Sequence, residues 1–187
     1  MRGNRGFTLI EVIVVAAIIA ILAGILVPMI FNQVDEAKNS RARGDCKTIS
    51  TALLMFRKDT GKWPYFDASC TPYFTTLQSS SGILPDSTVN SWNLGDGQEI
   101  LFSFILNLPA GTACYNNSTA LGYLPQDQAD PWDRKYIVNS INFGNNNPVW
   151  VISAGPNGCM DTSVNSPNLN DTPCTANPGD DLGVRIK

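Results

Sequence analysis

The C-terminal part of the sequence holds the side chains best suited to binding a cation. Carboxylate and amide oxygens recur in a stretch that lacks helical or strand periodicity: Asn157, Asp161, Asp171, Asp180 and Asp181. Calcium takes about six to eight oxygen ligands from carboxylates, amide carbonyls and the backbone, in a flexible loop. The pattern predicts a calcium site with Asp161, Asp180 and Asp181 as its main ligands and Asn157 as an additional one. The alternative is a polar, solvated loop that a disulfide holds in place.

The cysteines indicate disulfides and an oxidising compartment. Cys70, Cys114, Cys159 and Cys174 lie in the loop-rich part of the chain, where a small core benefits from crosslinks. Cys159 and Cys174 bracket a short loop, which would leave Cys70 with Cys114, although four cysteines allow more than one pairing. Cys46 is expected to be a free thiol on a helix. The sequence has no CxxC pattern, which argues against a thiol redox motif or a zinc ribbon.

Composition argues against two broad classes of function. The chain has 187 residues and no histidine, so it lacks the commonest general base and the Ser-His and Cys-His nucleophile pairs. The formal net charge is −3, and Arg41, Arg43 and Lys47 fit a solvated helix face, so nucleic-acid binding is not expected. We therefore expect a protein that is not an enzyme and has no nucleic-acid partner.

One carboxylate lies inside a long apolar run near the N-terminus. Arg2 and Arg5 precede the run, and the positive-inside rule keeps such a leader in the cytoplasm. The run from Phe7 to Phe31 is longer than the apolar region of a secretory signal and long enough to span a bilayer. Glu11 lies just inside it. The helix macrodipole favours an acid there by about 0.3–1 kcal/mol, but burial of the charge still requires a cationic partner.

The same helix is expected to continue well beyond the membrane. No proline occurs from Asn32 to Lys58, and apolar residues recur there at helical spacing. They are Ile49, Ala52, Leu53 and Phe56. Gly61 suits a left-handed helix cap and Pro64 follows it, so the helix should end near Lys58. The apolar stripe predicts that the second half of the helix packs against a head domain.

The remaining elements predict a small, loop-rich head. Residues 96–108 are expected to form a short buried helix with Asp96 as its N-cap. Residues 135–143 and 148–153 predict an antiparallel hairpin, and residues 182–186 are a candidate third strand. The expected fold class is therefore α+β. A long N-terminal helix packs by its second half on a small antiparallel sheet, and a long C-terminal loop belongs to the head.

The N-terminal residues resemble those of a known family. Gly6-Phe7-Thr8-Leu9-Ile10-Glu11, with a basic leader before it and an apolar helix after it, is similar to the N-terminus of the type IV pilin and type II secretion pseudopilin superfamily. The resemblance implies that a prepilin peptidase cuts after Gly6 and methylates Phe7. It also implies that Glu11 pairs with the Phe7 amine of a neighbouring subunit. Pro28 stands where the family has a proline.

Three later segments resemble the major pseudopilin of type II secretion. They are Asp130–Tyr136, Ser153–Gly158 and Gly179–Gly183, which correspond to an Asp-Pro-Trp turn, a Ser-x-Gly-x-x-Gly turn and an acidic segment. The resemblance implies calcium in the C-terminal loop, which the oxygen ligands indicate independently. The stretch 66–117 is longer than its counterpart in a typical major pseudopilin.

Together these features predict a filament subunit. Residues 1–6 form the leader, 7–31 the membrane and filament-core helix, 32–58 its continuation and 59–187 the head. The favoured function is the structural subunit of a type II secretion pseudopilus. It would be held in the bacterial inner membrane by a single pass, with the head outside the cytoplasm. Its partners would be copies of itself, the prepilin peptidase, the inner-membrane assembly machinery and minor pilins or pseudopilins.

Two alternatives remain open from the sequence. The first is a type IV pilin of a surface pilus that acts in adhesion, motility or DNA uptake, because such a pilin shares every N-terminal feature. The second is a membrane-anchored enzyme or binding protein that uses the acidic loop.

Overall fold

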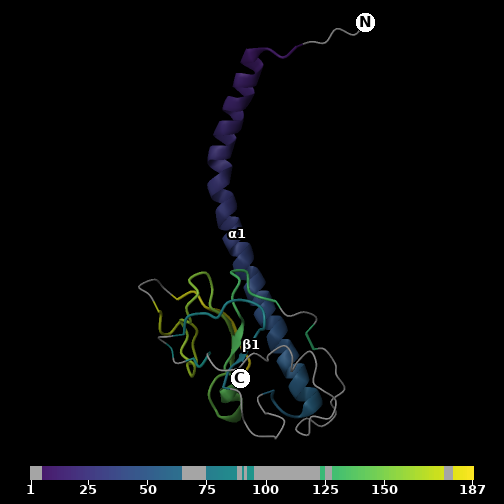
Figure 1. The fold of residues 1–187 in the computed structure, drawn as a ribbon, viewed down its shortest axis with the longest axis vertical. Helices are drawn as coiled ribbons and strands as arrows, with labels where there is room; N and C mark the ends of the chain where they lie inside the picture. Colours follow the sequence, from purple (N-terminus) through teal and green to yellow (C-terminus); the bar gives the residue numbers. More distant parts are fainter. Residues whose placement is uncertain are drawn as a thin grey trace. The chain divides into compact units, whose positions relative to one another are not determined.

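The computed structural model describes residues 6–64, 75–87, 90, 92–94, 123–124, 128–174 and 179–187. In this part of the chain one long helix comes first and four short strands follow, with a 3₁₀ helix between the second and third strands (Figure 1). This arrangement confirms the predicted α+β class. The helix predicted at 96–108 lies outside the described residues, as do Cys70 and Cys114.

Helix α1 spans Leu9–Thr60 and ends slightly beyond the predicted end at Lys58. Thr60 belongs to the last turn, and its hydroxyl donates to the Phe56 carbonyl at 2.7 Å. Gly61 then adopts a φ of 74°, and its N–H donates to the Arg57 carbonyl at 2.9 Å. This left-handed conformation confirms the predicted cap.

The chain forms two compact units, Met1–Lys38 and Asn39–Lys187, and α1 contributes residues to both. In the first unit the helix is apolar and exposed. Its apolar segment is long enough to cross a membrane and is 0% buried. By length and composition, this part of α1 can cross a membrane.

The second unit contains a four-stranded antiparallel sheet in the order β1-β2-β3-β4. The strands are β1 (Leu77–Gln78), β2 (Ile137–Val138), β3 (Trp150–Ser153) and β4 (Leu182–Arg185). Ile137 of β2 pairs with Ile152 of β3, and Ser153 of β3 pairs with Leu182 of β4. The predicted hairpin pairing and third strand are thus confirmed, and β1 is an additional strand.

The first arm of the predicted hairpin is shorter than expected, because its end forms a 3₁₀ helix, Ser140–Gly144. Two asparagines explain the difference. Asn139 and Asn142 each donate from the side-chain amide to the Pro148 carbonyl at 2.9 Å. The Asn139 Oδ1 also accepts the Trp150 N–H at 2.7 Å. Side-chain amides therefore take the place of strand-to-strand bonds, and the backbone leaves the sheet.

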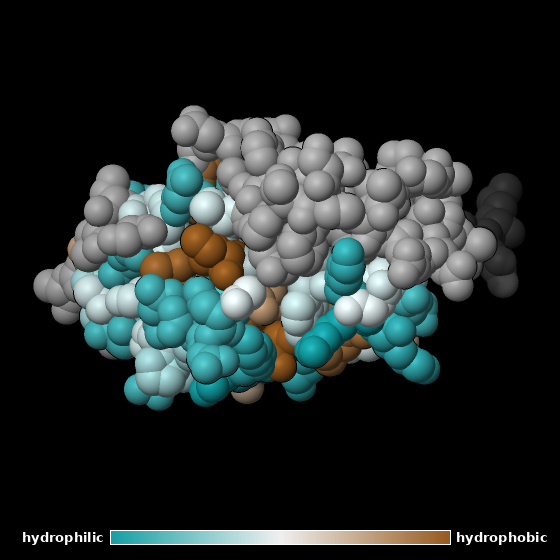
Figure 2. Space-filling model, turned by 90° about the horizontal axis from the view of Figure 1, so that it is seen from below, coloured by the Kyte–Doolittle hydropathy of each residue, from teal (hydrophilic) through white to brown (hydrophobic). Residues whose placement is uncertain are grey.

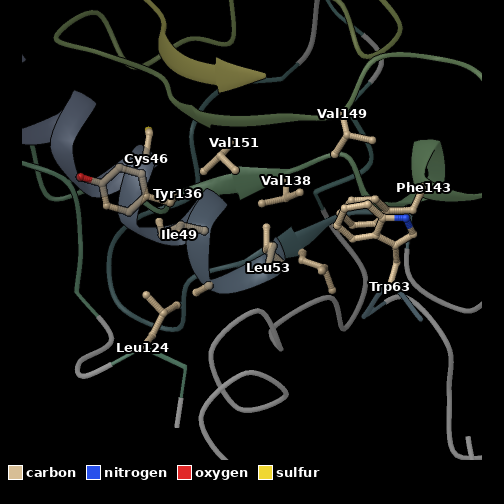
Figure 3. Close-up of a cluster of buried hydrophobic side chains, with 12 residues drawn as sticks. Cys46, Ile49, Leu53, Trp63, Leu124, Tyr136, Val138, Phe143, Val149 and Val151 are labelled. Carbon is tan, nitrogen blue, oxygen red and sulfur yellow. The ribbon is translucent and has the colours of Figure 1, made fainter. Parts of the chain in front are cut away.

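One face of the sheet packs on α1. Three residues of the predicted apolar stripe, Ile49, Ala52 and Leu53, are buried there with residues of the sheet and of the segment after the helix (Figure 3). The cluster comprises Cys46, Ile49, Ala52, Leu53, Trp63, Leu77, Leu124, Tyr136, Val138, Phe143, Val149 and Val151. The rings of Trp63 and Phe143 stack with centroids 4.2 Å apart. Tyr136 also donates its hydroxyl to Asp45 on α1 at 2.8 Å, so polar and apolar contacts together fix this half of the helix to the sheet.

The opposite face of the sheet is covered by the loop that follows β3. Successive strand residues point to opposite faces, so Ile137, Trp150 and Ile152 join a second buried cluster that includes Met160 of this loop. The Trp150 indole N–H donates to the Ser166 carbonyl at 2.8 Å. Burial and hydrogen bonds therefore attach the loop with the candidate cation ligands to the sheet.

The described surface of the head is mainly polar. On the face shown in Figure 2 the described residues are mostly hydrophilic, with small separate hydrophobic patches. Among the described residues, large exposed apolar side chains concentrate in the first half of α1. The apolar surface available for association therefore lies mainly in that segment.

Candidate functional site

The predicted processing junction lies just before α1. Gly6, Phe7 and Thr8 have no regular secondary structure, and the Phe7 side chain is 83% exposed. Apart from the neighbours of Gly6 in the chain, no atom of the described residues lies within 4 Å of the position that a Cβ on Gly6 would occupy. The Gly6–Phe7 peptide bond is therefore accessible and not helical.

Glu11 caps the first turn of α1. Its Oε2 accepts the Thr8 N–H at 2.9 Å and the Thr8 hydroxyl at 2.8 Å, while the Thr8 Oγ1 accepts the Glu11 N–H at 3.4 Å. This reciprocal pattern is a capping box, for which Thr8-x-x-Glu11 is the sequence signature. Thr8 thus holds the Glu11 side chain at the start of the helix, a contact that the charge argument misses, although its spacing to Glu11 identifies it.

Pro28 removes one hydrogen bond from the apolar half of α1. Proline has no N–H to donate to the carbonyl four residues earlier, which belongs to Gly24. The helix is continuous through both residues. Gly24 and Pro28 therefore mark a local weak point in an otherwise regular helix.

Asp161 is fully buried in the acidic loop. Its Oδ1 accepts the Cys174 N–H at 2.7 Å, and its Oδ2 accepts the Asp180 N–H at 3.1 Å and the Asn157 amide at 2.8 Å. Although burial opposes ionisation, the three donated bonds hold the pKa of Asp161 below its usual value. One ionised carboxylate thus joins three segments of the loop.

Asp180 and Asp181 carry the carboxylate oxygens that lack partners. Asp181 is 2% exposed, and neither of its carboxylate oxygens receives a hydrogen bond of normal geometry from the described residues. The same holds for Oδ1 of Asp180, while its Oδ2 accepts the Asn157 N–H at 3.0 Å. Buried polar atoms almost always have a partner, so these oxygens are suited to a ligand.

The carboxylates of the loop also act on one another. Burial is the main cause that raises the pKa of Asp181 to about 7, and the nearby charge of Asp161 adds to it. Burial and contact with Asp161 likewise raise the pKa of Asp180. No lysine or arginine in the described part of the chain forms an ion pair with these acids. Carboxylates that form no ion pair with a described lysine or arginine suit a hard divalent cation such as calcium.

Three of the four predicted ligands, Asn157, Asp161 and Asp180, are joined by hydrogen bonds, whereas the Asp181 side chain has no hydrogen bond to them. Both polar atoms of the Asn157 side chain make hydrogen bonds. Its Oδ1 accepts the Cys159 N–H at 2.7 Å, and its Nδ2 donates to Asp161 Oδ2 at 2.8 Å. Asp171, the remaining acid of the loop, belongs to a separate turn. Its Oδ1 accepts the Ser163 N–H at 2.7 Å.

The predicted Cys159–Cys174 disulfide is present, and Cys46 is a buried free thiol, as expected. The predicted pair of Cys70 and Cys114 lies outside the described residues. The sulfur atoms of Cys159 and Cys174 lie within 4.8 Å of a carboxylate oxygen of Asp161. Because both sulfurs are in the disulfide, they are not thiolate ligands. The candidate ligands of this loop are therefore oxygen atoms.

A glycine turn brings the loop close to the acidic segment. Gly155 has a φ of 60°, and a Cβ on it would lie 2.3 Å from the Asp180 carbonyl oxygen, so only glycine fits without a shift. Its own carbonyl accepts a hydrogen bond from the Arg134 Nη1 at 2.5 Å. The Ser153 hydroxyl donates to Asp130 at 2.6 Å. The segments that resemble the major pseudopilin in sequence are thus in direct contact.

Comparisons with known proteins find similarity in the N-terminal segment and over most of the chain. Residues 1–27 match the family model described as the prokaryotic N-terminal methylation motif. The chain is similar to the type II secretion system core protein G of Escherichia coli (strain K12), with 30% identity over 159 residues that cover 85% of this chain and 86% of that protein. The protein of the same name from Pseudomonas aeruginosa is 30% identical over 168 residues, which cover 90% of this chain and 94% of that protein.

A third relative, the core protein G of Dickeya chrysanthemi, is 26% identical over 90% of this chain and 88% of its own length. No solved structure matches the chain. The apolar helix, the methylation motif and the similarity over most of the chain establish that the protein belongs to the family of type II secretion system core protein G, the major pseudopilin.

Proposed function

We propose that the protein is the structural subunit of a type II secretion pseudopilus and has no catalytic activity of its own. The observation that carries this proposal is the exposed apolar first half of α1, whose membrane-length segment is 0% buried. A surface of this kind is stable in a membrane or against other copies of the chain. The shared name of the relatives favours a secretion pseudopilus over a surface pilus.

The subunit is first held in the bacterial inner membrane by this helix, as a single pass. Arg2 and Arg5 keep the leader in the cytoplasm, so the head lies outside it. The Cys159–Cys174 disulfide supports this placement, because disulfides persist in oxidising compartments. Assembly then moves the helix from lipid into a filament of like subunits. The inner-membrane assembly machinery and minor pseudopilins are its partners.

Processing precedes assembly. A prepilin peptidase cuts the precursor after Gly6 and methylates Phe7, and the accessible, non-helical junction supports this step. Mass spectrometry of the N-terminus of the membrane-extracted protein is expected to find a methylated Phe7. Filaments whose subunits retain Met1–Gly6 would contradict the proposal.

Cleavage changes the surroundings of Glu11, because it creates a positively charged amine on Phe7. In the filament, Glu11 pairs with this amine of a neighbouring copy. The pairing offsets the cost of burying a carboxylate, which is about 2.5–3.5 kcal/mol at the centre of a span and less near its edge. Within the subunit, Thr8 supplies hydrogen bonds to Glu11 but no charge. Glu11 therefore sets the register and recruitment of subunits more than the net stability of the filament.

Two substitutions test this role. Glu11→Ala should give processed protein that fails to assemble in a filament-shearing assay. Glu11→Gln is the sharper variant, because its amide oxygen still accepts hydrogen bonds from Thr8 but carries no charge. Glu36→Gln, which removes an exposed acid of the same helix, is the control and should assemble normally. Normal filaments from Glu11→Gln would rule out charge pairing.

The head is proposed to hold a calcium ion. Asp180 and Asp181 supply the unpartnered oxygens, and Asp161 and Asn157 complete the set of side chains. Bound calcium supplies positive charge to carboxylates that otherwise repel one another. Asp161 has a second task, since it accepts N–H hydrogen bonds from both Cys174 and Asp180 in the structure.

Thermal unfolding of the full chain in detergent tests the site. Calcium is expected to raise the melting temperature and a chelator to reverse the rise. Asp181→Asn should abolish the response. Asp171→Asn is the matched control, because it removes one acid of the same loop outside the cluster. A wild-type melting temperature that is the same with calcium and with chelator would exclude the ion.

A further inference from the structure

The Cys159–Cys174 disulfide is linked to the candidate cation site through Asp161. The N–H of Cys174 donates to Asp161 Oδ1 at 2.7 Å, and the N–H of Asp180 donates to Asp161 Oδ2 at 3.1 Å. One carboxylate therefore binds both a crosslinked residue and a candidate ligand. A displacement of Cys174 removes one of the donors that hold this carboxylate in place.

The other cysteine is linked to the same site through Asn157. The N–H of Cys159 donates to Asn157 Oδ1 at 2.7 Å, and the N–H of Asn157 donates to Asp180 Oδ2 at 3.0 Å. Each half of the disulfide thus has its own hydrogen-bonded path to Asp180. The disulfide closes the two paths into one ring that contains Asp161 and Asn157.

The affinity of this ring for a cation depends on how far its ligands are already held in place before the cation binds. The candidate ligands are carboxylates that repel one another, and the free energy needed to bring them together reduces affinity unless the fold has already done so. Partners that orient metal ligands typically change metal affinity by about 10–100-fold. Cys174 is partly exposed, so a thiol reagent can reach the bond.

We propose that the Cys159–Cys174 disulfide positions the calcium site, so that the affinity for calcium depends on this bond. The proposal rests on the calcium site of the proposed function. An external dithiol can break the bond: it transfers two electrons and two protons, two cysteine thiols form, and the dithiol becomes a cyclic disulfide. The covalent tie between the two paths is then lost, and Asp161 and Asn157 no longer hold Asp180 in a closed ring.

Isothermal titration calorimetry of the full chain in detergent tests the proposal. Calcium chloride is titrated into chelator-treated protein in the oxidised state, after reduction with dithiothreitol, and after reoxidation. Reduction is expected to weaken calcium binding by about tenfold or more, and reoxidation to restore it. Near-ultraviolet circular dichroism of the buried tryptophans Trp92 and Trp150 follows whether the head stays folded.

A double variant separates this disulfide from the other cysteines. Cys159→Ser/Cys174→Ser should bind calcium with the affinity of the reduced wild type and should not respond to dithiothreitol. A double variant that still loses affinity on reduction would overturn the proposal, because another cysteine would then be responsible.

The outcomes distinguish this inference from the calcium site itself. Equal affinities of oxidised and reduced protein would overturn the inference and leave the calcium site in place. An oxidised protein that binds no calcium would overturn both. Loss of the near-ultraviolet signal on reduction would also overturn the positioning role, because the bond would then act by keeping the whole head folded.

Discussion

Replacement of Asp181 by asparagine should change the stability of the head in opposite directions with and without calcium. The Asp181 side chain is 2% exposed, and its carboxylate oxygens lack partners among the described residues. In the calcium-free protein its ionisation is unfavourable, because burial raises its pKa to about 7. Asparagine has nearly the same shape and no charge. It removes this unfavourable ionisation, but it also removes a calcium ligand.

The size of the effect follows from the pKa. A rise from 3.8 to about 7 corresponds to about 4 kcal/mol once the group is fully ionised. A raised folded-state pKa stabilises the protein fully below the unfolded pKa, and this stabilisation is lost as the pH rises through the folded pKa. Calcium-free wild-type protein should therefore lose stability as the pH rises from about 4 to about 7, and about 3 kcal/mol of this loss should fall between about pH 5 and about pH 8.

The neighbouring acids do not reverse this loss of stability with rising pH. The pKa of Asp180 is raised as well, so its contribution has the same direction. The pKa values of Asp161 and Asp171 are lowered, so both acids are ionised in the folded and unfolded states over this range. Their stabilising contributions are lost only when the pH falls below that range.

Chemical denaturation of the full chain in detergent at about pH 5 and about pH 8, with chelator or calcium, measures the effect. With chelator at the higher pH, Asp181→Asn should be more stable than the wild type and should depend less on pH. With calcium, the wild type should be the more stable protein. Asp171→Asn should keep the wild-type response to calcium. The reasoning is refuted if the calcium-free wild type has the same stability at both pH values, or if Asp181→Asn retains the full pH dependence.

Three further substitutions test other parts of the structure. Leu53→Ala should destabilise the head by about 2–5 kcal/mol in chemical denaturation, because Leu53 is fully buried. Leu54→Ala is the control and should cost about 1 kcal/mol or less, because Leu54 is 46% exposed. Equal losses of stability would contradict the packing of α1. Gly155→Ala should destabilise the head by more than about 1 kcal/mol in the same assay and weaken calcium binding. The alanine Cβ would lie 2.3 Å from the Asp180 carbonyl oxygen. Wild-type stability of the variant would contradict this close approach. Thr8→Val should weaken the first turn of α1 by about 1 kcal/mol and so speed amide hydrogen exchange at Glu11. Thr8→Ser keeps the hydroxyl and should not change the exchange rate. An unchanged rate in the valine variant would contradict the capping box.

Those parts of the fold that have local signals can be predicted from the sequence. The buried stripe of α1 follows from helical spacing, and β3 and β4 follow from short apolar runs. Strand β1 has no such signal, because Leu77 and Gln78 are strand residues only through their pairing with β2. The 3₁₀ helix Ser140–Gly144 likewise depends on where the Asn139 amide finds an acceptor in the folded chain.

The residue types of the candidate site can be predicted, but their separate roles cannot. Asp161 and Asp181 are equivalent carboxylates in the sequence. In the structure, Asp161 accepts three hydrogen bonds and joins segments of the loop, while Asp181 has unpartnered oxygens. This difference depends on which N–H groups face each side chain, and tertiary packing decides that. The Thr8–Glu11 capping box is the opposite case, because its spacing alone predicts it.

Glu11 and Asp181 lie in different compact units of the chain, and both are carboxylates without a cationic partner among the described residues. On the proposed function, cleavage supplies the cation for Glu11 as the amine of another copy, and a calcium ion supplies it for Asp181. The two requirements are then independent. A cleavage-defective Gly6→Val variant should bind calcium with wild-type affinity in calorimetry and still fail to form filaments. Chelator should lower the melting temperature of the wild type and leave methylation of Phe7 unchanged in mass spectrometry. Loss of calcium binding in the uncleaved variant would show instead that processing and the calcium site are coupled.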